Sequence, residues 1–156
     1  MKGHAEIIEA LNDVLTAELT AINQYFVDSK MAANWGYERL AAHFREESID
    51  EMKDAEALIE RILYLDGLPN LQRLSPVRIG ETIPEKLELA LDLERMAIER
   101  LNNGVARCSA MGDHGSRQLL DRILHGEEEH ADWIESQLEA ISQIGAANYL
   151  AQQLHP

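Results

Sequence analysis

Two short stretches of the sequence carry matching pairs of side chains that could bind a metal ion. The stretch DEMKDAE places Glu51 three residues before Asp54, and GEEEHAD places Glu127 three residues before His130. Residues three apart lie on the same side of an α-helix, so each pair can point at one ion. Carboxylates with a minority of imidazoles suit iron or manganese. The two stretches therefore predict two similar half-sites for divalent metal ions.

Other acids interrupt the apolar stripes of the sequence. Apolar side chains recur every three or four residues in four long segments, and each stripe predicts a helix that packs into a bundle. Glu18 replaces an apolar residue on the first stripe and Glu94 on the third, while Glu47 and Glu51 do so on the second. With Glu127 on the fourth stripe, each helix is predicted to point an acid into the bundle.

The spacing of these acids indicates two related halves. Glu51 follows Glu18 by 33 residues, as Glu127 follows Glu94. Buried carboxylates without partners cost too much free energy to be kept for packing alone. Dinuclear helix bundles bind their metals with one Glu from each of two helices and Glu-x-x-His from each of the other two. The sequence therefore predicts a dinuclear metal site made by Glu18, Glu51, Asp54, Glu94, Glu127 and His130.

The charge of the chain excludes some classes of partner. The 156 residues include 28 acidic and 14 basic side chains, which gives a formal net charge of −14 at pH 7. Phosphate binding needs a basic face, so we expect no nucleic acid and no membrane surface as partner. The excess of acid suits a protein that attracts cations. The length fits a single domain over residues 1–156.

Cysteine content and hydropathy indicate the compartment. Cys108 is the only cysteine, so no intrachain disulfide can form, and a reducing bacterial cytoplasm is expected. The first residues, MKGHAEIIEALNDVL, are charged and amphipathic and lack the apolar core of a signal peptide. No run of 18 apolar residues is found, so no membrane span is expected.

Turn and capping residues divide the chain into four long helices. The stretch NWGYE predicts a turn after the first helix. Thr82 and Glu85 of TIPE predict a capping box at the start of the third. Gly112 is expected to end that helix and Asp113 to cap the fourth, which ends at Gly145. The stretch AANYLAQQL then predicts a short fifth helix.

The longest connection between helices covers residues 66–81. An extended chain of 16 residues reaches about 53 Å, and a helix of 27 residues is about 40 Å long. This connection can therefore run the full length of the bundle and join two antiparallel hairpins. The expected fold is all-α, a ferritin-like four-helix bundle with one long crossover and a short C-terminal fifth helix.

Five longer stretches carry a resemblance to a known family: LNDVLTAELTAINQYFVDSKM, NWGYERLA, ERILYLDGLPNLQRL, IGETIPEKLELALDLE and EEEHADWIESQL. In them the chain resembles the bacterioferritins, along essentially its whole length. The resemblance implies iron storage and a ferroxidase acting on Fe²⁺ with dioxygen or hydrogen peroxide. It also implies a hollow shell of 24 identical subunits, haem b at two-fold interfaces and a small ferredoxin as reductant. The iron ligands that it implies are Glu18, Glu51, Glu94, Glu127 and His130, with Glu51 and Glu127 bridging.

Position 54 departs from the family pattern, which usually has His where this chain has Asp54. A carboxylate can ligate, but its reach is shorter, and its negative charge favours ferric iron and hinders release. Two interpretations stay open: a complete ferroxidase, or a haem-carrying, ferroxidase-impaired subunit that shares a shell with a second, competent subunit type. A di-iron peroxidase or oxygenase acting on another substrate is a further alternative.

Met52 is the residue that the resemblance places at the haem-ligand position. A second apolar stripe on its helix and another on the first helix predict burial against a second copy across a two-fold axis, where two thioethers could ligate one haem iron. The stripes consist of Ile49, Met52, Ile59 and Leu63, and of Ile8, Leu15, Leu19, Ile22 and Phe26. The expected haem pocket is lined by Leu19, Ile22, Asn23, Phe26, Ile49 and Ala55, with Arg45 and Lys53 at the propionates.

Several other side chains are candidates for auxiliary roles. Tyr25 is expected near the metal ligands, and Trp133 could donate an electron to oxidised iron. The acids that could guide iron are Glu46, Glu47 and Asp50. The histidines without a matched partner, expected to be surface or structural residues, are His4, His43, His114, His125 and His155.

Overall fold

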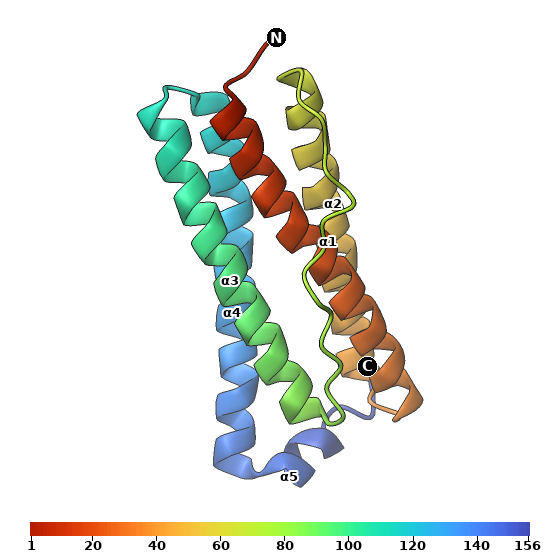
Figure 1. Cartoon of the computed structure of the whole chain (residues 1–156). Coiled ribbons are helices and arrows are strands. Elements are labelled where there is room, and N and C mark those ends of the chain that lie inside the picture. The colour runs from red at the N-terminus through yellow and green to blue at the C-terminus, as the bar shows by residue number, and fades with distance from the viewer.

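The computed structural model describes residues 1–156 and is entirely helical (Figure 1). The helices are α1 (Ala5–Asn34), α2 (Glu38–Tyr64), α3 (Ile83–Ala110), α4 (His114–Ile144) and α5 (Ala146–Ala151). The first four form a bundle of two antiparallel hairpins, α1 with α2 and α3 with α4, and α5 crosses one end of it. The expected all-α fold, four long helices with one long crossover and a short fifth helix, is confirmed. None of the helices combines the length and hydropathy that crossing a membrane requires.

The predicted helix ends are confirmed by the backbone. Gly36, Gly112 and Gly145 have φ angles of 87°, 74° and 83°, in the left-handed region that favours glycine, and each stands at a helix boundary. The Asp113 carboxylate accepts a hydrogen bond from the Ser116 N–H at 3.0 Å and so caps α4.

The start of α3 differs slightly from the predicted capping box. The Thr82 hydroxyl accepts from the Glu85 N–H at 3.3 Å, as expected. The Glu85 carboxylate, however, accepts from the N–H of Glu81 at 2.8 Å and not from that of Thr82. The chain bends at residues 81–82, which brings the Glu81 N–H over the first turn of the helix.

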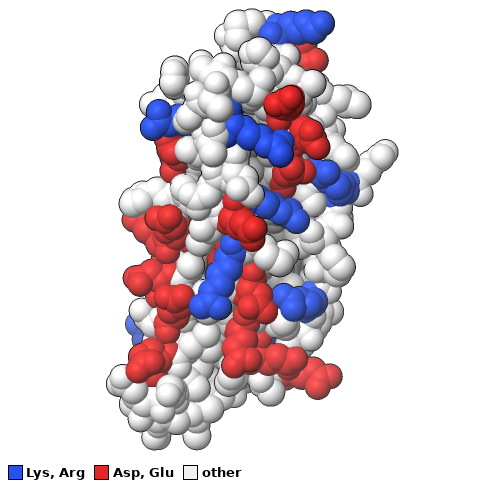
Figure 2. Space-filling view, turned by 60° about the vertical axis from the view of Figure 1, so that its left-hand side comes forward, with Lys and Arg blue, Asp and Glu red and all other residues white.

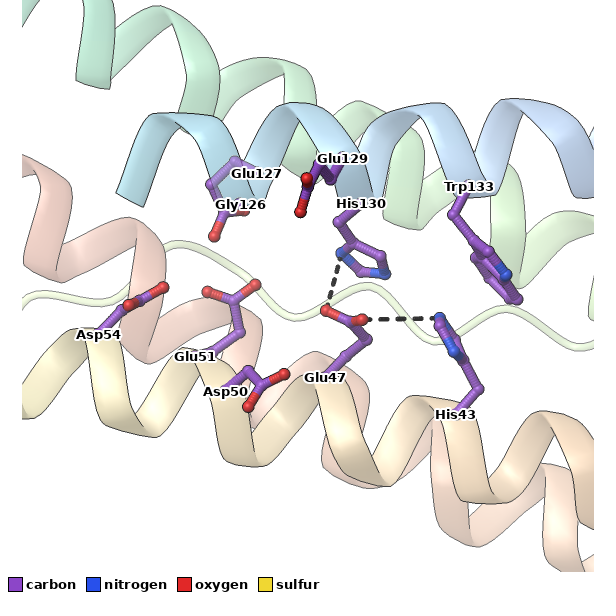
Figure 3. A pocket seen from close by; sticks show the side chains of 10 residues that line it. All are labelled: His43, Glu47, Asp50, Glu51, Asp54, Gly126, Glu127, Glu129, His130 and Trp133. Atoms are coloured by element: carbon purple, nitrogen blue, oxygen red, sulfur yellow. Dashed lines mark ion pairs between the residues drawn. The ribbon is translucent and has the colours of Figure 1, made fainter. Parts of the chain in front are cut away.

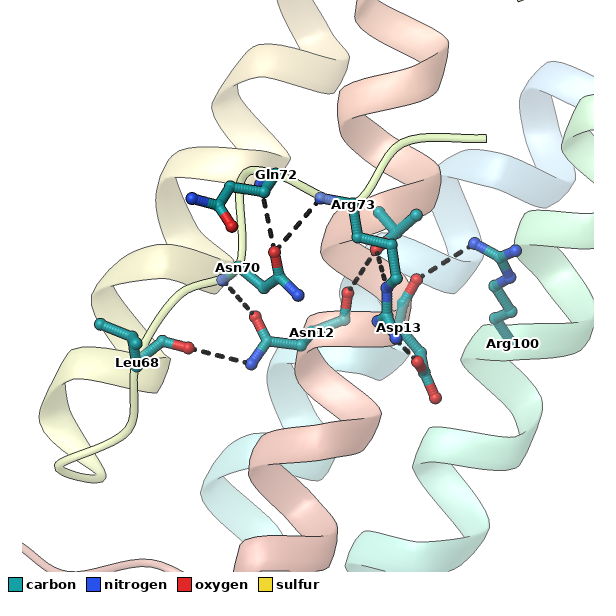
Figure 4. Close-up of polar contacts among 8 residues, drawn as sticks. Asn12, Asp13, Leu68, Asn70, Gln72, Arg73 and Arg100 are labelled. Atoms are coloured by element: carbon teal, nitrogen blue, oxygen red, sulfur yellow. Dashed lines mark hydrogen bonds and ion pairs between the residues drawn. The ribbon is translucent and has the colours of Figure 1, made fainter. Parts of the chain in front are cut away.

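The crossover at residues 66–81 runs along the bundle beside α1 (Figure 1). It is held by a polar row on α1, which we define as Asn12, Thr16, Thr20 and Gln24, each one turn after the last. The Asn12 side chain donates to the Leu68 carbonyl at 3.1 Å and accepts from the Asn70 N–H at 2.8 Å (Figure 4).

The rest of the polar row continues these contacts along the loop. Thr16 accepts from the Arg73 guanidinium at 2.9 Å, and Thr20 accepts from the Ser75 N–H at 3.0 Å. Gln24 donates to the Arg78 carbonyl at 2.7 Å and accepts from the Arg78 N–H at 3.0 Å. Side chains of one helix thus satisfy backbone groups along a segment that has no regular structure of its own.

The core of the bundle consists of two apolar clusters with a polar layer between them. One cluster, at the end that carries α5, includes Tyr25, Phe44, Leu87 and Ile134. The other includes Leu11, Leu58, Leu101 and Ile123. On every helix the predicted metal-binding acid lies between its two clusters in sequence, so the four acids occupy one level, as the 33-residue repeat predicts.

A buried ion pair fixes the junction of α1, α3 and the end of the crossover. The Lys86 ammonium donates to the Asp28 carboxylate at 2.9 Å, and both side chains are almost wholly buried. Gln24 lies 3.4 Å from the same carboxylate, and the Lys86 nitrogen lies 5.5 Å from the centre of the Trp35 ring. Burial raises the pKa of Asp28, although Lys86 opposes that shift.

Removal of one partner of this pair should destabilise the chain strongly. We expect Lys86→Met to lower the free energy of unfolding by about 3–5 kcal/mol, because it leaves a buried carboxylate without its counter-charge. The double variant with Asp28→Leu should recover much of that loss. The matched control, Arg95→Met in an exposed pair with Glu135, should cost less than about 1 kcal/mol. Denaturant unfolding checks these values, and equal losses for both single variants would contradict the argument.

Candidate metal centre

The structure brings the predicted metal-binding residues together at the polar layer. Glu18 and Glu94 are 1 % exposed, Glu51 2 %, Glu127 4 % and His130 6 %. Ligand atoms of Glu18, Glu51, Asp54 and Glu127 all lie within 4.8 Å of one another and form what we call the first group. Those of Glu51, Glu94 and His130 do the same and form the second group. Glu51 belongs to both groups, which suits a residue that touches two ions.

The buried polar atoms of this layer have few partners within the protein. Both carboxylate oxygens of Glu18, one each of Glu51 and Glu94, and Nε2 of His130 are buried and accept or donate no hydrogen bond. Leaving such atoms unpaired costs free energy, more so for charged groups. A donor set of carboxylates with one imidazole fits iron or manganese, and zinc also binds such sites. The residues present therefore fit a pair of divalent ions.

Burial controls the ionisation of the glutamates. It raises the pKa of Glu18, Glu51 and Glu127 well above the ordinary value, and repulsion by neighbouring carboxylates adds to the shift. The pKa of Glu94 rises to about 7, again through burial, although hydrogen bonds with Glu127 and Tyr25 oppose the rise. Near neutral pH these glutamates therefore tend to keep their protons in the metal-free protein.

Tyr25 makes the contact with a ligand that the sequence predicts. Its hydroxyl donates to a carboxylate oxygen of Glu94 and lies 3.5 Å from Nδ1 of His130. The same oxygen of Glu94 lies 3.0 Å from that nitrogen. Burial raises the pKa of Tyr25 and the charge of Glu94 raises it further, so the phenol stays protonated and remains a donor.

Asp54 points into the first group but is less buried than the glutamates. Its Oδ1 lies 3.5 Å from the guanidinium of Arg122 on α4, whose side chain is 60 % exposed. Burial raises the pKa of Asp54, and the positive charge of Arg122 opposes that shift. When ionised, the five carboxylates carry five negative charges, and Arg122 reduces the local total to four. That total matches two divalent cations. Arg122 lies outside the inward-facing stripe of its helix, so the sequence pattern does not indicate it.

A pocket of about 280 Å³ between α2 and α4 opens beside the centre (Figure 3). The lining residues are His43, Glu47, Asp50, Glu51, Asp54, Gly126, Glu127, Glu129, His130 and Trp133. Asp50 and Glu129 are exposed at its mouth, so the buried ligands have a route to solvent. Of the acids expected to guide iron, Glu47 and Asp50 line this pocket, but the exposed Glu46 does not.

His43 corrects the prediction that it has no partner near the site. Its Nε2 lies 3.7 Å from Oε1 of Glu47, whose Oε2 lies 3.2 Å from Nδ1 of His130 (Figure 3). Its ring stacks on Trp133, with ring centres 3.5 Å apart. The signal in the sequence was the four-residue spacing of His43 and Glu47 on an inward-facing turn. The other four, His4, His114, His125 and His155, are exposed, as expected.

The expected haem face is apolar and largely exposed. Met52 is 50 %, Phe26 55 % and Ile49 42 % exposed, so the bundle itself does not use these side chains. An exposed thioether on such a face fits a ligand held between two chains. The prediction that Leu15 of α1 belongs to this face is wrong. Leu15 is fully buried in the core of the bundle. Ala55 is also in that core, at 4 % exposure.

On the face shown in Figure 2, acidic side chains gather in two rows in the lower half, with basic side chains between, beside and above them. This agrees with the formal net charge of −14. Such a surface raises the local concentration of cations.

Known proteins resemble this chain over nearly its full length. A family model described as a ferritin-like domain matches residues 8–144. The bacterioferritin of Mycobacterium bovis is 49 % identical over 152 residues, which cover 97 % of this chain and 96 % of that protein. The bacterioferritin of Mycobacterium leprae is 47 % identical over the same shares. The bacterioferritin of Streptomyces coelicolor is 46 % identical over 97 % of this chain and 90 % of that protein.

The raised pKa values predict how the stability of the metal-free protein depends on pH. Between the ordinary glutamate pKa of 4.5 and the value of about 7 for Glu94, the folded chain keeps a proton that the unfolded chain has released. The free energy of unfolding should therefore fall as the pH rises through this window. Thermal unfolding of the metal-free protein at pH 5.5 and 7.5 checks this, and the Glu94→Gln variant should show a smaller decrease. A melting temperature that rises with pH in the metal-free protein would contradict it.

The charge on Arg122 should weaken metal binding at the first group. We expect Arg122→Ala to tighten Co²⁺ binding by a few-fold, because it frees Asp54 and removes a repulsive charge that solvent partly screens. Titration calorimetry measures the affinity. Arg95→Ala, at a similarly exposed arginine away from the centre, is the matched control and should leave it unchanged. Weaker binding in Arg122→Ala would show instead that Arg122 positions Asp54 for the metal.

Proposed function

The chain belongs to the bacterioferritin family, and from this premise we propose that it is a ferroxidase that oxidises Fe²⁺ and stores the product as mineral in a multi-subunit shell. Family membership supports iron storage, and the oxidation step is inferred from the centre. One observation carries that inference: buried acids from all four helices, with one imidazole, meet at a single level with polar atoms left unpaired.

The first and second groups each offer a place for one Fe²⁺ substrate ion. Glu51 belongs to both groups, in agreement with the bridging role that the resemblance implies. Glu127, the other implied bridge, belongs to the first group. Glu18 and Asp54 complete that group, and Glu94 and His130 complete the second. Holding two ions side by side makes a two-electron reaction with one oxidant effectively unimolecular.

The glutamates also handle the protons of the reaction. Because burial holds their pKa values high, binding of Fe²⁺ displaces protons from them. Tyr25 donates to Glu94 throughout and keeps that carboxylate oriented toward His130. The apolar clusters on either side restrict water to the pocket between α2 and α4.

The electron balance requires two Fe²⁺ ions for each oxidant molecule. Two Fe²⁺ become two Fe³⁺, and dioxygen takes up the two electrons and two protons to become hydrogen peroxide. With hydrogen peroxide as oxidant, the same two electrons and two protons yield two molecules of water. The Fe³⁺ then leaves through the acidic pocket and is deposited as mineral.

The structure bears on the two alternatives to this proposal. Asp54 lies within the first group despite its shorter side chain, which supports a complete centre over an impaired subunit in a mixed shell. Trp133 is the only hydrophobic residue that lines the pocket. Pockets for organic substrates are mostly apolar, so an oxygenase or peroxidase acting on such a substrate is not favoured.

The proposal extends to the assembly and its partners. Copies of this chain would form a shell of 24 in the bacterial cytoplasm, with haem b held between two Met52 side chains at each two-fold axis. A haem with two thioether ligands supplies an electron path when bound. A small ferredoxin would deliver the electrons that release stored iron. The exposed apolar face around Met52 supports this arrangement.

Stopped-flow absorbance after mixing with two Fe²⁺ per chain in air tests the oxidation step. We expect a fast, saturating phase in the native protein, because Asp54 completes the first group. Glu94→Gln should lower the initial rate by at least about tenfold, since it removes a carboxylate from the second group. The matched control is Glu46→Gln, which changes an exposed glutamate on α2 outside the pocket and should leave the rate unchanged.

An Asp54→His variant separates the proposal from its main alternative. It should oxidise iron at a rate within a few-fold of the native protein. If the native trace were no faster than protein-free iron and the fast phase appeared only in Asp54→His, the chain would be the impaired subunit of a mixed shell.

A further inference from the structure

A further set of possible metal ligands lines the same pocket. It comprises His43 and Glu47 of α2 and His130 of α4, whose ligand atoms all lie within 4.8 Å of one another. We call these three residues the outer group. The proposed oxidation uses neither His43 nor Glu47 as a ligand. The outer group shares only His130 with the second group.

The carboxylate of Glu47 lies between the two imidazoles of the outer group (Figure 3). One oxygen is 3.7 Å from Nε2 of His43, and the other is 3.2 Å from Nδ1 of His130. Ligands around a tetrahedral ion with bonds of about 2.1 Å lie roughly 3.4 Å from one another. The spacing of the outer group is therefore within a few tenths of an ångström of what such an ion requires at these two contacts.

Both histidines have a buried nitrogen that makes no hydrogen bond. Nε2 of His43 and Nε2 of His130 are buried and take part in no hydrogen bond, and His130 as a whole is 6 % exposed. A buried imidazole nitrogen is normally paired. Nδ1 of His130 lies 3.2 Å from Glu47 and 3.0 Å from Glu94, so this nitrogen is within reach of both the outer and the second group. The unpaired nitrogens indicate that the outer group is prepared for a ligand that the protein does not supply.

The His43 ring is held in position by its packing. It stacks on Trp133 with an interplanar angle of 20°, and its ring centre lies 5.7 Å from that of His130. Burial lowers the pKa of His43 to about 4. Trp133 thus has a structural role at this pocket, as the surface on which the His43 ring rests.

We propose that His43, Glu47 and His130 form a third metal site, which takes a divalent transition-metal ion such as Fe²⁺ or Zn²⁺. Two histidines and one carboxylate form the donor set of open Fe²⁺ sites and of His₂Glu zinc sites. The remaining coordination positions face the pocket, where water or the nearby Asp50 completes the shell. The proposal needs only metal binding, so it goes beyond iron oxidation and does not depend on it.

The position of this third site gives it a role in metal traffic. It lines the same pocket as the exposed Asp50 and Glu129 and as Glu51 and Glu127 of the buried centre. Because His130 belongs to both the outer and the second group, an ion in the third site is adjacent to the buried centre. The third site would therefore hold an ion beside the dinuclear centre, in the pocket that opens to solvent.

Crystals of the full assembly soaked in Zn²⁺ test the proposal directly. Anomalous difference maps at the zinc edge should show a peak between His43, Glu47 and His130. In solution, titration calorimetry with Zn²⁺ should show that His43→Gln binds one ion fewer per chain than the native protein. His43→Phe, which keeps an aromatic ring against Trp133, should lose the same ion, and this separates loss of a ligand from loss of packing.

The chain supplies a matched control at His125, which pairs with Glu129 at the same four-residue spacing but is exposed and has no third ligand. His125→Gln should bind as many Zn²⁺ ions as the native protein. Glu18→Gln should disturb the dinuclear centre and leave the anomalous peak at the outer group in place, so the two proposals can fail separately. The third site is refuted if that peak is absent from the native protein, or if His43→Gln binds as many ions.

Discussion

The burial of four glutamates at one level of a helical bundle is the constraint on which the rest of this structure depends. Carboxylates removed from water cost several kcal/mol each unless protons, hydrogen bonds or cations compensate them. Glu18 and Glu94 are nearly inaccessible, and part of their polar surface has no partner in the protein. The apolar clusters on either side must therefore supply the stability that the polar layer removes. Under the proposed function, the layer is kept because it binds metal, and divalent ions are the ligands that its donors suit.

The same constraint explains why the long crossover is held to the bundle by so many polar contacts. Four acids from four helices meet at one level only if the two hairpins are aligned along their length. The crossover performs that alignment, and the polar row on α1 ties it down at Asn12, Thr16, Thr20 and Gln24. The Lys86–Asp28 pair then fixes the first turn of α3 against α1. Polar contacts far from the centre thereby set the positions of its ligands.

The centre is asymmetric, and the asymmetry is distributed over several residues. Asp54 adds a carboxylate to the first group, and Arg122 lies close enough to balance its charge. On the other side, His43 and Glu47 extend the second group toward solvent. Tyr25 donates a hydrogen bond to Glu94, the partner of His130, and Trp133 stacks on His43. Aromatic rings thus hold the imidazole side of the centre. The two half-sites are therefore alike in their glutamates and different in their surroundings.

The sequence by itself determined the bundle and the level of the centre, because both follow from periodicity. Apolar stripes with interrupting acids, a 33-residue repeat and glycine or capping signals at the turns are local features, and helical geometry converts them directly into faces and ends. The tertiary structure alone decided which other side chains face those acids. Examples are the place of Arg122, the partners of His43, the burial of Leu15 and the loop contacts of the polar row. Each depends on contacts between residues that are distant in the chain or lie at the edge of a helix. Periodicity does not specify such pairs, because they depend on how two helices are rotated and spaced against each other.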